Sequence, residues 1–519
     1  MESAKLRVWA VPDSESKPAA VPRGTAVARR PQPRLKSIDR QQSLLRAVDV
    51  ERLVEEDHPV RAIWELVGRL LPADFYGGIK AVEGTAGQAA FDPQLLTSLW
   101  VYGYSRGISS AREIARLCEY HPAYQWLTGL ETVNYHSLSD FRSRHPEALT
   151  RLFTEVLGLL SHAGLITLER VMQDGTKIKA FAADNSFRRQ ATLRQHLEKA
   201  REQVEQMGDP ESEALTQRVA QARERARREK QQRLELALQQ LPEIQATTSS
   251  EARASSSDPQ ARIMHSQGGF APGYNVQLST DAAAKIIVGV GVSQAAADAA
   301  ELVPAIARVE ANLGQTPQQM VVDSGFTNQS TIEAMAAASI DLIGTLPDPA
   351  AHSEAALRQR GVSPEFFPQA FTYDPVANGY TCPAGQTLAY DGKEKKGTAT
   401  RYRYRAKISD CQSCPLKAQC CPHNKKGRSI VRTEDSPAVA AFKAKMRTQA
   451  AQDIYKQRSG VAEFPNAWIK AKIGLRQFRL RGLAKVGLEA LWACLTYNIQ
   501  QWIRLVWRPQ LPIRKTSLA

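Results

Sequence analysis

Segments of strand type and of helical type alternate between residues 169 and 347, and their order constrains the fold more than any other feature. The first strand-like segment, 169–181, is separated from the second, 274–281, by a long helical stretch and a polar linker. The segment 285–293 follows closely and should form a hairpin with the second. A helix over 298–313, a strand ending at 322, a helix near 331–338 and a strand at 341–347 complete the order. This order predicts an α/β protein with a mixed sheet.

The helical stretch that interrupts this order, 186–245, is rich in Arg, Glu, Gln and Ala. Its apolar positions form two stripes on either side of a turn at 208–210. The first stripe contains Leu193, Leu197, Ala200, Val204 and Met207, and the second contains Leu215, Val219, Ala222 and Ala226. The stripes predict an antiparallel helical hairpin whose alternating charges face solvent. With this hairpin inserted after the first strand, the element order is that of a ribonuclease-H-like fold.

Two aspartates hold special positions in this scheme. Asp174 lies in the middle of the first strand, where a charge is costly unless it is paired or binds a metal. Asp323 follows an apolar strand, at the edge where open α/β sheets bind ligands. Carboxylates that meet there suit Mg²⁺, and two such ions can promote phosphodiester cleavage. The alternative is that each aspartate, closely followed by glycine, is a turn residue.

Asn275 and Gln277 alternate on one face of the segment 274–281. Their amides could orient a metal shell or contact DNA. The alternative is that both are ordinary polar residues of an edge strand.

The charge of the chain narrows the classes of partner. Its 519 residues carry a net charge of +15, which favours a polyanion because each Lys or Arg set against a phosphate releases a counterion. No apolar run approaches the roughly 18 residues that a membrane helix needs. The first residues also lack the apolar segment of a secretory signal.

Residues 1–45 are rich in Pro, Arg, Lys and Ser, which indicates a disordered basic arm or, alternatively, a frayed terminus.

Residues 46–168 have helical spacing and are predicted to form a DNA-binding domain. One helix capped by Ser109 or Ser110 and a second opened by Ser137 could form a helix-turn-helix-like reader. That reader would turn Arg142 and Arg144 toward the duplex. Because the connection between the helices is long for this motif, a plain bundle with solvated arginines is the alternative.

Cysteines cluster in the segment 370–432, which is predicted to be a zinc-ribbon-like insertion. Cys411 and Cys414 have the spacing of a zinc knuckle, and Cys382 with Cys420 could complete a tetrahedral thiolate site. Cys421 could take the place of Cys420. Such clustering favours metal in a reducing cytoplasm over a disulfide scaffold. Free thiols are the alternative.

The segment 435–508 is predicted to complete the catalytic domain begun by 169–347, and 509–519 forms a tail. The apolar, helically spaced run 483–507 predicts a core helix that covers the sheet. The preceding stretch is basic and suits a DNA-binding rim, or alternatively a solvated surface. This stretch contains Lys470, Lys472, Arg476, Arg479 and Arg481.

Nearly all of the chain after residue 35 resembles the DDE transposases of bacterial insertion sequences, in particular the insertion-sequence 1182 group with its cysteine-rich insertion. Seven segments in the same order carry the resemblance. They are EDHPVRAIWELV (56–67), FDPQLLTSLWVYGYSRGISSAREIARLC (91–118), VMQDGTKIKA (171–180), SDPQARIM (257–264), YNVQLSTD (274–281), VVDSGF (321–326) and RGLAKVGLEALWACLTYNIQ (481–500).

The resemblance implies a catalytic triad of Asp174, Asp323 and Glu463 that binds Mg²⁺ or Mn²⁺. Glu463 belongs to a Tyr, Arg, Glu, Lys signature, in which Lys470 would contact phosphate and Arg458 would do the same or orient the carboxylate. The gap between Arg458 and Glu463 is one position longer than in the better-known signature. Glu434, Glu489 and Asp453 are the rival third acids.

The activity implied is strand cleavage at transposon ends, followed by attack of the released 3′-hydroxyl on target DNA. Double-stranded DNA would be the partner, bound by a homodimer in the bacterial cytoplasm at the nucleoid, with no membrane association. The alternatives are a catalytically inactive or domesticated DNA-binding protein and a structure-specific nuclease on the same fold.

Overall fold

The computed structural model describes residues 45, 47–79, 81, 89–205, 217–266, 269–346, 349–396 and 399–511. The chain divides into two units, Met1–Val48 and Asp49–Ala519. The predicted basic arm lies outside the described residues except for Leu45, as does the tail beyond residue 511. The elements below all belong to the second unit.

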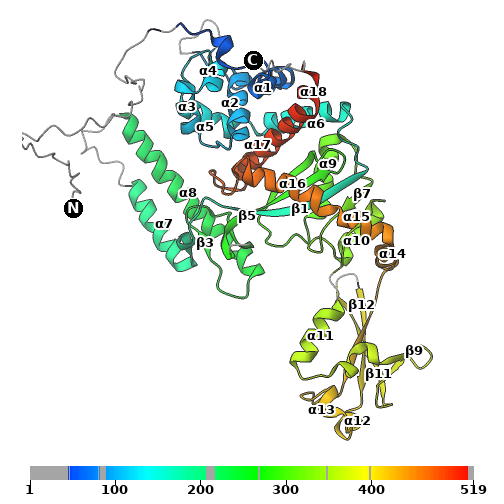
Figure 1. The fold of residues 1–519 in the computed structure, drawn as a ribbon. Helices are drawn as coiled ribbons and strands as arrows, with labels where there is room; N and C mark the ends of the chain where they lie inside the picture. The colour runs from blue at the N-terminus through cyan, green and yellow to red at the C-terminus, as the bar shows by residue number, and fades with distance from the viewer. Residues whose placement is uncertain are drawn as a thin grey trace, which may run out of the picture. The chain divides into compact units, whose positions relative to one another are not determined.

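A mixed β-sheet forms the centre of this unit (Figure 1). Strand β1 (Arg170–Lys179) pairs antiparallel with β5 and parallel with β7, and β8 adds a further parallel strand. Strands β4 and β6 both pair antiparallel with β5. The predicted α/β class with a mixed sheet is therefore confirmed. The strand bounds are β4 (Arg262–Ser266), β5 (Gly269–Asp281), β6 (Ile287–Ser293), β7 (Gln319–Val321) and β8 (Asp341–Ile343).

Helices cover the sheet. Helix α9 (Leu302–Leu313) packs on β5 and β6, and α16 (Arg458–Ala471) packs on β1 and β5. Helix α10 (Gln329–Ala337) is started by Asn328, whose side chain accepts a hydrogen bond from the Thr331 amide. Helices α14 (Pro437–Met446) and α15 (Gln449–Lys456) precede α16 in the chain.

The helices before β1 share one apolar core with the sheet through α17 (Leu483–Trp502), which contacts α2, α6 and β6 (Figure 1). The predicted core helix is therefore confirmed, and a π-helical turn, Ile503–Trp507, continues it. No helix in the described ranges is both long and apolar enough to span a bilayer. The N-terminal helices are α1 (Pro59–Leu70), α2 (Pro93–Ser105), α3 (Ala111–Tyr120), α4 (Pro122–Thr128), α5 (Tyr135–Arg144) and α6 (Pro146–His162).

The connection between α3 and α5 differs from the prediction. It contains helix α4, which begins at Pro122 and is capped by the side chain of His121. Helix α5 begins at Tyr135 with Asn134 as its cap, rather than at Ser137. Proline at the first helical position costs no hydrogen bond, so His121-Pro122 is a helix start signal that the sequence-based prediction missed.

The predicted helical hairpin consists of α7 (Gln190–Glu205) and the longer α8 (Gln217–Thr247). Leu193, Leu197 and Ala200 of the predicted α7 stripe are buried, whereas Val204 is half-buried and Met207 lies outside the described residues. The predicted α8 stripe is wrong, because Ala222 and Ala226 are exposed and the buried positions lie two to four turns later. These positions are Leu234, Ala237 and Leu241. The turn 208–210 and Leu215 lie outside the described residues.

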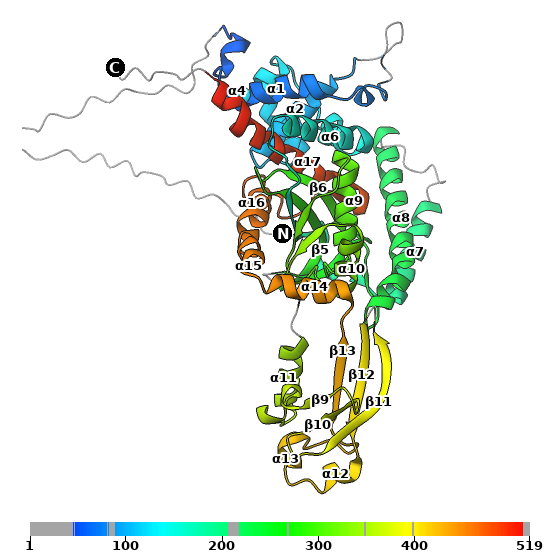
Figure 2. The same ribbon diagram turned by 90° about the vertical axis from the view of Figure 1, so that its right-hand side faces the viewer.

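The cysteine-rich segment contains a second, antiparallel sheet in the order β13-β12-β11-β10-β9 (Figure 2). A small apolar core of its own includes Phe371, Leu388 and Tyr404. The segment also contains two short helices, α12 (Ile408–Gln412) and α13 (Lys417–Cys420). Cys411 lies in α12 and Cys420 in α13, while Cys414 and Cys421 lie within two residues of a helix end. The remaining bounds are α11 (Pro349–Gln359), β9 (Thr372–Asp374), β10 (Gly379–Thr381), β11 (Thr387–Lys396), β12 (Ala399–Ala406) and β13 (Ser429–Glu434).

Candidate active site

Asp174 lies within β1, and Asp323 lies two residues after the end of the neighbouring parallel strand β7. The last paired residues of these two strands are Met172 and Val321, so each aspartate lies two residues beyond that pair. Burial raises the pKa of Asp174 to about 6, against the lowering effect of the Arg458 guanidinium, and the Asp323 carboxylate raises it further. Because only the ionised carboxylate binds a cation well, protons and metal compete for Asp174 near neutral pH.

Gly175 is required for space rather than for a turn. It lies inside β1, and a Cβ atom there would be 2.4 Å from Oδ1 of Asp298 and 2.7 Å from the side-chain nitrogen of Gln277. The turn alternative for Asp174-Gly175 is therefore wrong. Asp323 does lie in a turn, because its Oδ1 accepts a 2.8 Å hydrogen bond from the amide of Gly325.

A third aspartate, Asp298, lies on the connection between β6 and α9 and packs against the face of β1 that carries Lys177, opposite to the side chain of Asp174. Its Oδ1 accepts hydrogen bonds from Asn275 at 2.7 Å and Gln277 at 2.6 Å. The ammonium of Lys177 lies 3.2 Å from Oδ1 and 3.3 Å from Oδ2. From the sequence, Asp298 was interpreted only as a helix start. The available signal was an acid placed just after a strand of the sheet, in the same way as Asp323.

The amides of β5 belong to a buried network rather than to an edge. Strand β5 has neighbours on both sides, and Asn275 and Gln277 are at most 1% exposed. Gln173 donates to Gln277 at 2.7 Å and accepts from Ser279 at 2.6 Å. The edge-strand and DNA-contact interpretations of these two residues are therefore wrong, while a role in orienting carboxylates agrees with their contacts to Asp298.

Helix α16 presents Asn466, not Glu463, to Asp174. The Asn466 amide donates to Asp174 Oδ2 at 2.8 Å, and the Arg458 guanidinium lies 3.8 Å from Oδ1. Lys470 lies near Asp174 as well. Burial lowers the pKa of its amino group, and the negative charge of Asp174 acts in the opposite direction and raises it. Glu463 is exposed and has no hydrogen-bond or ion-pair partner among the described residues.

Two buried amide oxygens beside these carboxylates lack partners. They are Oδ1 of Asn466, next to Asp174, and Oδ1 of Asn275, next to Asp298. Unpaired acceptors in buried positions are costly, and hard cations bind carboxylate and amide oxygens, so the Asp174 carboxylate and the Asn466 oxygen fit a divalent ion. In the described part of the chain, no three His, Cys, Asp or Glu side chains already converge on one metal position.

The rival third acids have other roles. Glu489 is fully buried and accepts hydrogen bonds from the amides of Arg479 and Leu480. Glu434 accepts a hydrogen bond from Tyr402 in the second sheet, and the exposed Asp453 pairs with Lys456.

The predicted DNA-contact residues separate into two groups. Arg142 is only 6% exposed, lies 4.6 Å from the centre of the Trp100 ring and faces Glu489 at 3.9 Å. Its predicted contact with DNA is therefore wrong, because α5 turns this residue into the core. The other group reaches solvent and contains Arg144, Arg476 and Arg479.

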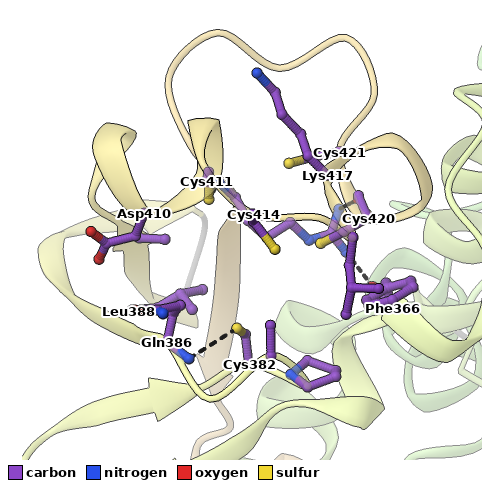
Figure 3. Close-up of a pocket in the computed structure, with 15 residues that line it drawn as sticks. Phe366, Cys382, Gln386, Leu388, Asp410, Cys411, Cys414, Lys417, Cys420 and Cys421 are labelled. Atoms are coloured by element: carbon purple, nitrogen blue, oxygen red, sulfur yellow. Dashed lines mark hydrogen bonds between the residues drawn. The ribbon is translucent and has the colours of Figure 1, made fainter.

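Five cysteines line one cavity of about 30 Å³ in the cysteine-rich segment (Figure 3). Two sulfurs accept backbone hydrogen bonds: Cys382 from Gln386 and Cys411 from Arg428, each at 3.3 Å. Such N–H donors stabilise thiolate charge. None of the seven cysteines forms a disulfide. The cavity is lined by Cys382, Cys411, Cys414, Cys420 and Cys421.

Two segments of the chain match known protein families. Residues 381–503 match the family model of the transposase DDE domain, and residues 48–144 match a transposase domain named DUF772. No curated protein matches the chain. A cryo-EM structure of the piggyBac transposase synaptic complex with hairpin DNA is 9% identical, covering 88% of this chain and 82% of that one. Its TM-score of 0.25 is too low to bear on the fold.

Both family models describe transposases, so the chain is an enzyme that acts on DNA. The pair of matched domains is typical of the transposases of bacterial insertion sequences. The DDE match includes Glu463 but neither Asp174 nor Asp323, so the roles of these residues depend on the geometry described above.

Proposed function

We propose that this transposase cleaves DNA at the ends of its element and joins the 3′ ends to target DNA at a site built on Asp174 and Asp323. The observation that carries the proposal is that Asp174 and Asp323 each lie two residues beyond the last pair of the parallel strands β1 and β7, close enough for the Asp323 charge to raise the pKa of Asp174. Divalent ions bound there, Mg²⁺ or Mn²⁺, would supply activation of the attacking oxygen and stabilisation of the leaving one. The unpaired oxygen of Asn466 supports this donor set.

We also propose a ribonuclease-H-like fold for the catalytic domain. Its support is the strand order β6-β5-β1-β7-β8, in which β5 is antiparallel to both of its neighbours and β1, β7 and β8 are parallel. Glu463 is the proposed third acid, because it belongs to the Tyr, Arg, Glu, Lys signature. It lies three residues before Asn466 on α16, and residues at that spacing are neighbours on a helix surface, so its carboxylate can turn toward Asp174.

The charged residues around the aspartates suit a DNA substrate. Arg458 and Lys470 lie beside Asp174, where they can hold a phosphate against the carboxylates. Arg476 and Arg479 extend this cationic surface to solvent, and Arg144 adds an exposed cation on α5. We propose that two copies act together, because a transposition event must join two ends.

The reaction is tested with the full chain, Mg²⁺ and a labelled duplex carrying the terminal sequences that flank its coding region. We expect nicks that leave 3′-hydroxyl ends and, with added plasmid, covalent joining of those ends to the plasmid. Nicks without joining would indicate a nuclease, and DNA binding without nicks would indicate a protein that no longer catalyses. Either result contradicts the proposed function.

We further propose that the cysteine cavity holds a structural Zn²⁺ bound by Cys382, Cys411, Cys414 and Cys420. The support is the gathering of these sulfurs around one cavity and the two backbone N–H donors that point at them. Cys421 lines the same cavity and is the alternative to Cys420. A thiolate site of this kind would stabilise a segment whose own apolar core is small.

The zinc content of the purified chain tests this assignment. We expect about one Zn²⁺ per chain, and we expect Cys414→Ser to lose most of it, because three thiolates hold the ion more weakly than four. Cys118→Ser and Cys494→Ser are matched controls, since both thiols are buried in the main core far from the cavity in sequence. A wild-type chain purified under reducing conditions without zinc would contradict the proposal.

A further inference from the structure

A cavity of about 280 Å³ lies among the N-terminal helices and the end of α17, where α2 packs against both α1 and α17 (Figure 1). Its lining comes from the start of α1, the end of α2, helix α16 and the π-helical turn. Three arginines line it, Arg106, Arg504 and Arg508, and no described acid does. Guanidinium groups gathered without a carboxylate attract an anion.

We propose that this cavity binds a backbone phosphate of the DNA duplex, apart from the phosphate at which the strand is cleaved. The inference rests on the proposed function for the identity of the partner. It adds a binding site on the side of α16 that faces away from Asp174. Four observations support it.

The first observation is that the three arginines lack acidic partners. Among the described residues, none of them forms an ion pair, and all three reach solvent. Asp57 is next to His58 in the chain but does not line the cavity. Burial lowers the pKa of the His58 imidazole, and the charge of Arg106 lowers it further. Positive charge therefore accumulates in the lining, and a bound phosphate would relieve the repulsion.

The second observation is that buried amides hold the lining in place. Gln501 is 1% exposed, and its Oε1 accepts hydrogen bonds from Nε and Nη2 of Arg504 at 3.1 and 2.7 Å. Nη1 of this guanidinium has no partner in the described part of the chain. Gln500 donates to the backbone oxygen of Ser105 at 3.3 Å and accepts from the Trp468 indole at 2.7 Å. A guanidinium oriented in advance loses little freedom when it binds phosphate.

The third observation is the π-helical turn that follows α17. The backbone amide of Arg508 donates to the carbonyl oxygen of Ile503, five residues earlier. Because Arg504 and Arg508 are four residues apart, their side chains leave the helix on the same side. Turns of this type are frequent at functional sites. This one presents two guanidinium groups to a single cavity, which suits the several oxygens of one phosphate.

The fourth observation is that the basic stretch before α17 adjoins the cavity. A Cβ on Gly474 would lie 3.2 Å from the backbone oxygen of Gly107, and a Cβ on Gly107 would lie 3.1 Å from that of Lys472. Arg106 precedes Gly107, and both Arg106 and Lys472 are exposed. Cations that continue from the basic stretch to the cavity match the spaced phosphates of a duplex better than a single small anion.

Helix geometry separates this cavity from the proposed cleavage site. Trp468 lines the cavity and follows Asn466 by two residues on α16. Successive residues of a helix are turned by about 100°, so the two side chains leave on opposite faces. Since Asn466 contacts Asp174, the phosphate bound beside Trp468 is a different one from the phosphate that is cleaved.

The test is the salt dependence of DNA binding, measured by fluorescence anisotropy with the full chain and a duplex carrying the terminal sequences. We expect Arg508→Gln to weaken binding roughly tenfold at low salt and to reduce the slope of log affinity against log salt by about 0.9, the loss of one phosphate contact. Arg69→Gln is the matched control, because it removes an equal charge from an exposed position at the far end of α1. A wild-type slope in Arg508→Gln would overturn the inference.

Arg106→Gln gives a second readout. Because both cations contact one phosphate, the double variant of Arg106→Gln and Arg508→Gln should lose less affinity than the product of the two single losses. Fully multiplicative losses would contradict a single shared phosphate.

Calorimetric titration with inorganic phosphate separates a DNA phosphate from a free one. If Arg508→Gln abolishes phosphate binding but keeps the wild-type slope with DNA, the cavity takes a small anion and the inference fails. Nicking by the wild-type chain keeps the two proposals apart. If it nicks and joins DNA while the arginine variants keep the wild-type slope, only the role of the cavity fails. If the variants lose slope but the wild-type chain never nicks, only the proposed function fails.

Discussion

Asp174→Asn is expected to reduce strand cleavage by roughly 10³-fold or more, because loss of a carboxylate ligand removes several kcal/mol of transition-state stabilisation. The substitution keeps the shape of the side chain, and its amide oxygen can still accept the hydrogen bond that Asn466 donates at 2.8 Å. DNA binding should therefore change little. The measurement is the rate of nicking of an end-containing duplex in Mg²⁺, with binding followed separately by fluorescence anisotropy.

The same variant should be more stable than the wild-type protein when metal is absent. Burial raises the pKa of Asp174 from 3.8 to about 6, so its ionised form destabilises the fold above pH 6 by about 3 kcal/mol at 1.36 kcal/mol per unit. Below about pH 4 the aspartate is protonated in both the folded and unfolded states, and the difference should vanish. The measurement is the free energy of unfolding in urea for the variant and the wild-type protein, at pH 8 and at pH 4, with a chelator present. The variant should be the more stable protein at pH 8 only.

Asp453→Asn is the control for both effects. Asp453 is an exposed acid on α15 that was a rival for the third ligand, and it pairs only with its helix neighbours. It should leave cleavage and stability near wild-type values. If Asp174→Asn cleaved DNA at the wild-type rate, the metal site would have to lie elsewhere.

Glu489→Ala is expected to lower the free energy of unfolding by about 3–5 kcal/mol, the cost typical of breaking a buried ion pair. Glu489 is fully buried on α17, and burial raises the pKa of its carboxyl group. Its removal leaves Arg142 without its counter-charge and the amides of Arg479 and Leu480 without an acceptor. The measurement is urea unfolding followed by tryptophan fluorescence.

Two further variants sharpen this result. Glu489→Gln keeps an acceptor and should lose less stability than the alanine variant. Glu310→Ala removes an exposed acid from helix α9 and should change the unfolding free energy by no more than about 0.5 kcal/mol. Equal stability of Glu489→Ala and the wild-type protein would show that the buried contact of α17 with α5 contributes nothing to the fold.

Regular, local patterns in the sequence were sufficient to predict several elements. The α7 stripe, the β5–β6 hairpin and the apolar helix α17 repeat at helical or strand spacing, and each formed as predicted. Asp174 and Asp323 were found for the same reason, because an acid inside or just after an apolar strand departs visibly from its surroundings. The α8 stripe was misplaced because alanines among many charged residues give little contrast.

Other features depended on neighbours that are distant in the chain. Arg142 looked like a DNA contact on its own helix, but the chain returns 350 residues later to cover it with Trp492. Asp298 had no motif of its own, and its polar contacts formed only when β1 and β5 brought Lys177, Gln277 and Asn275 around it.

The order of strands along the chain and the two central aspartates were thus indicated by the sequence alone, because periodicity and charge are properties of short segments, and the class of enzyme came from the resemblance of seven such segments to a known family. The identity of the groups around those aspartates was decided by the tertiary structure. Whether a polar side chain meets solvent, a carboxylate or another strand depends on which distant segments pack against it, and no local pattern encodes that contact.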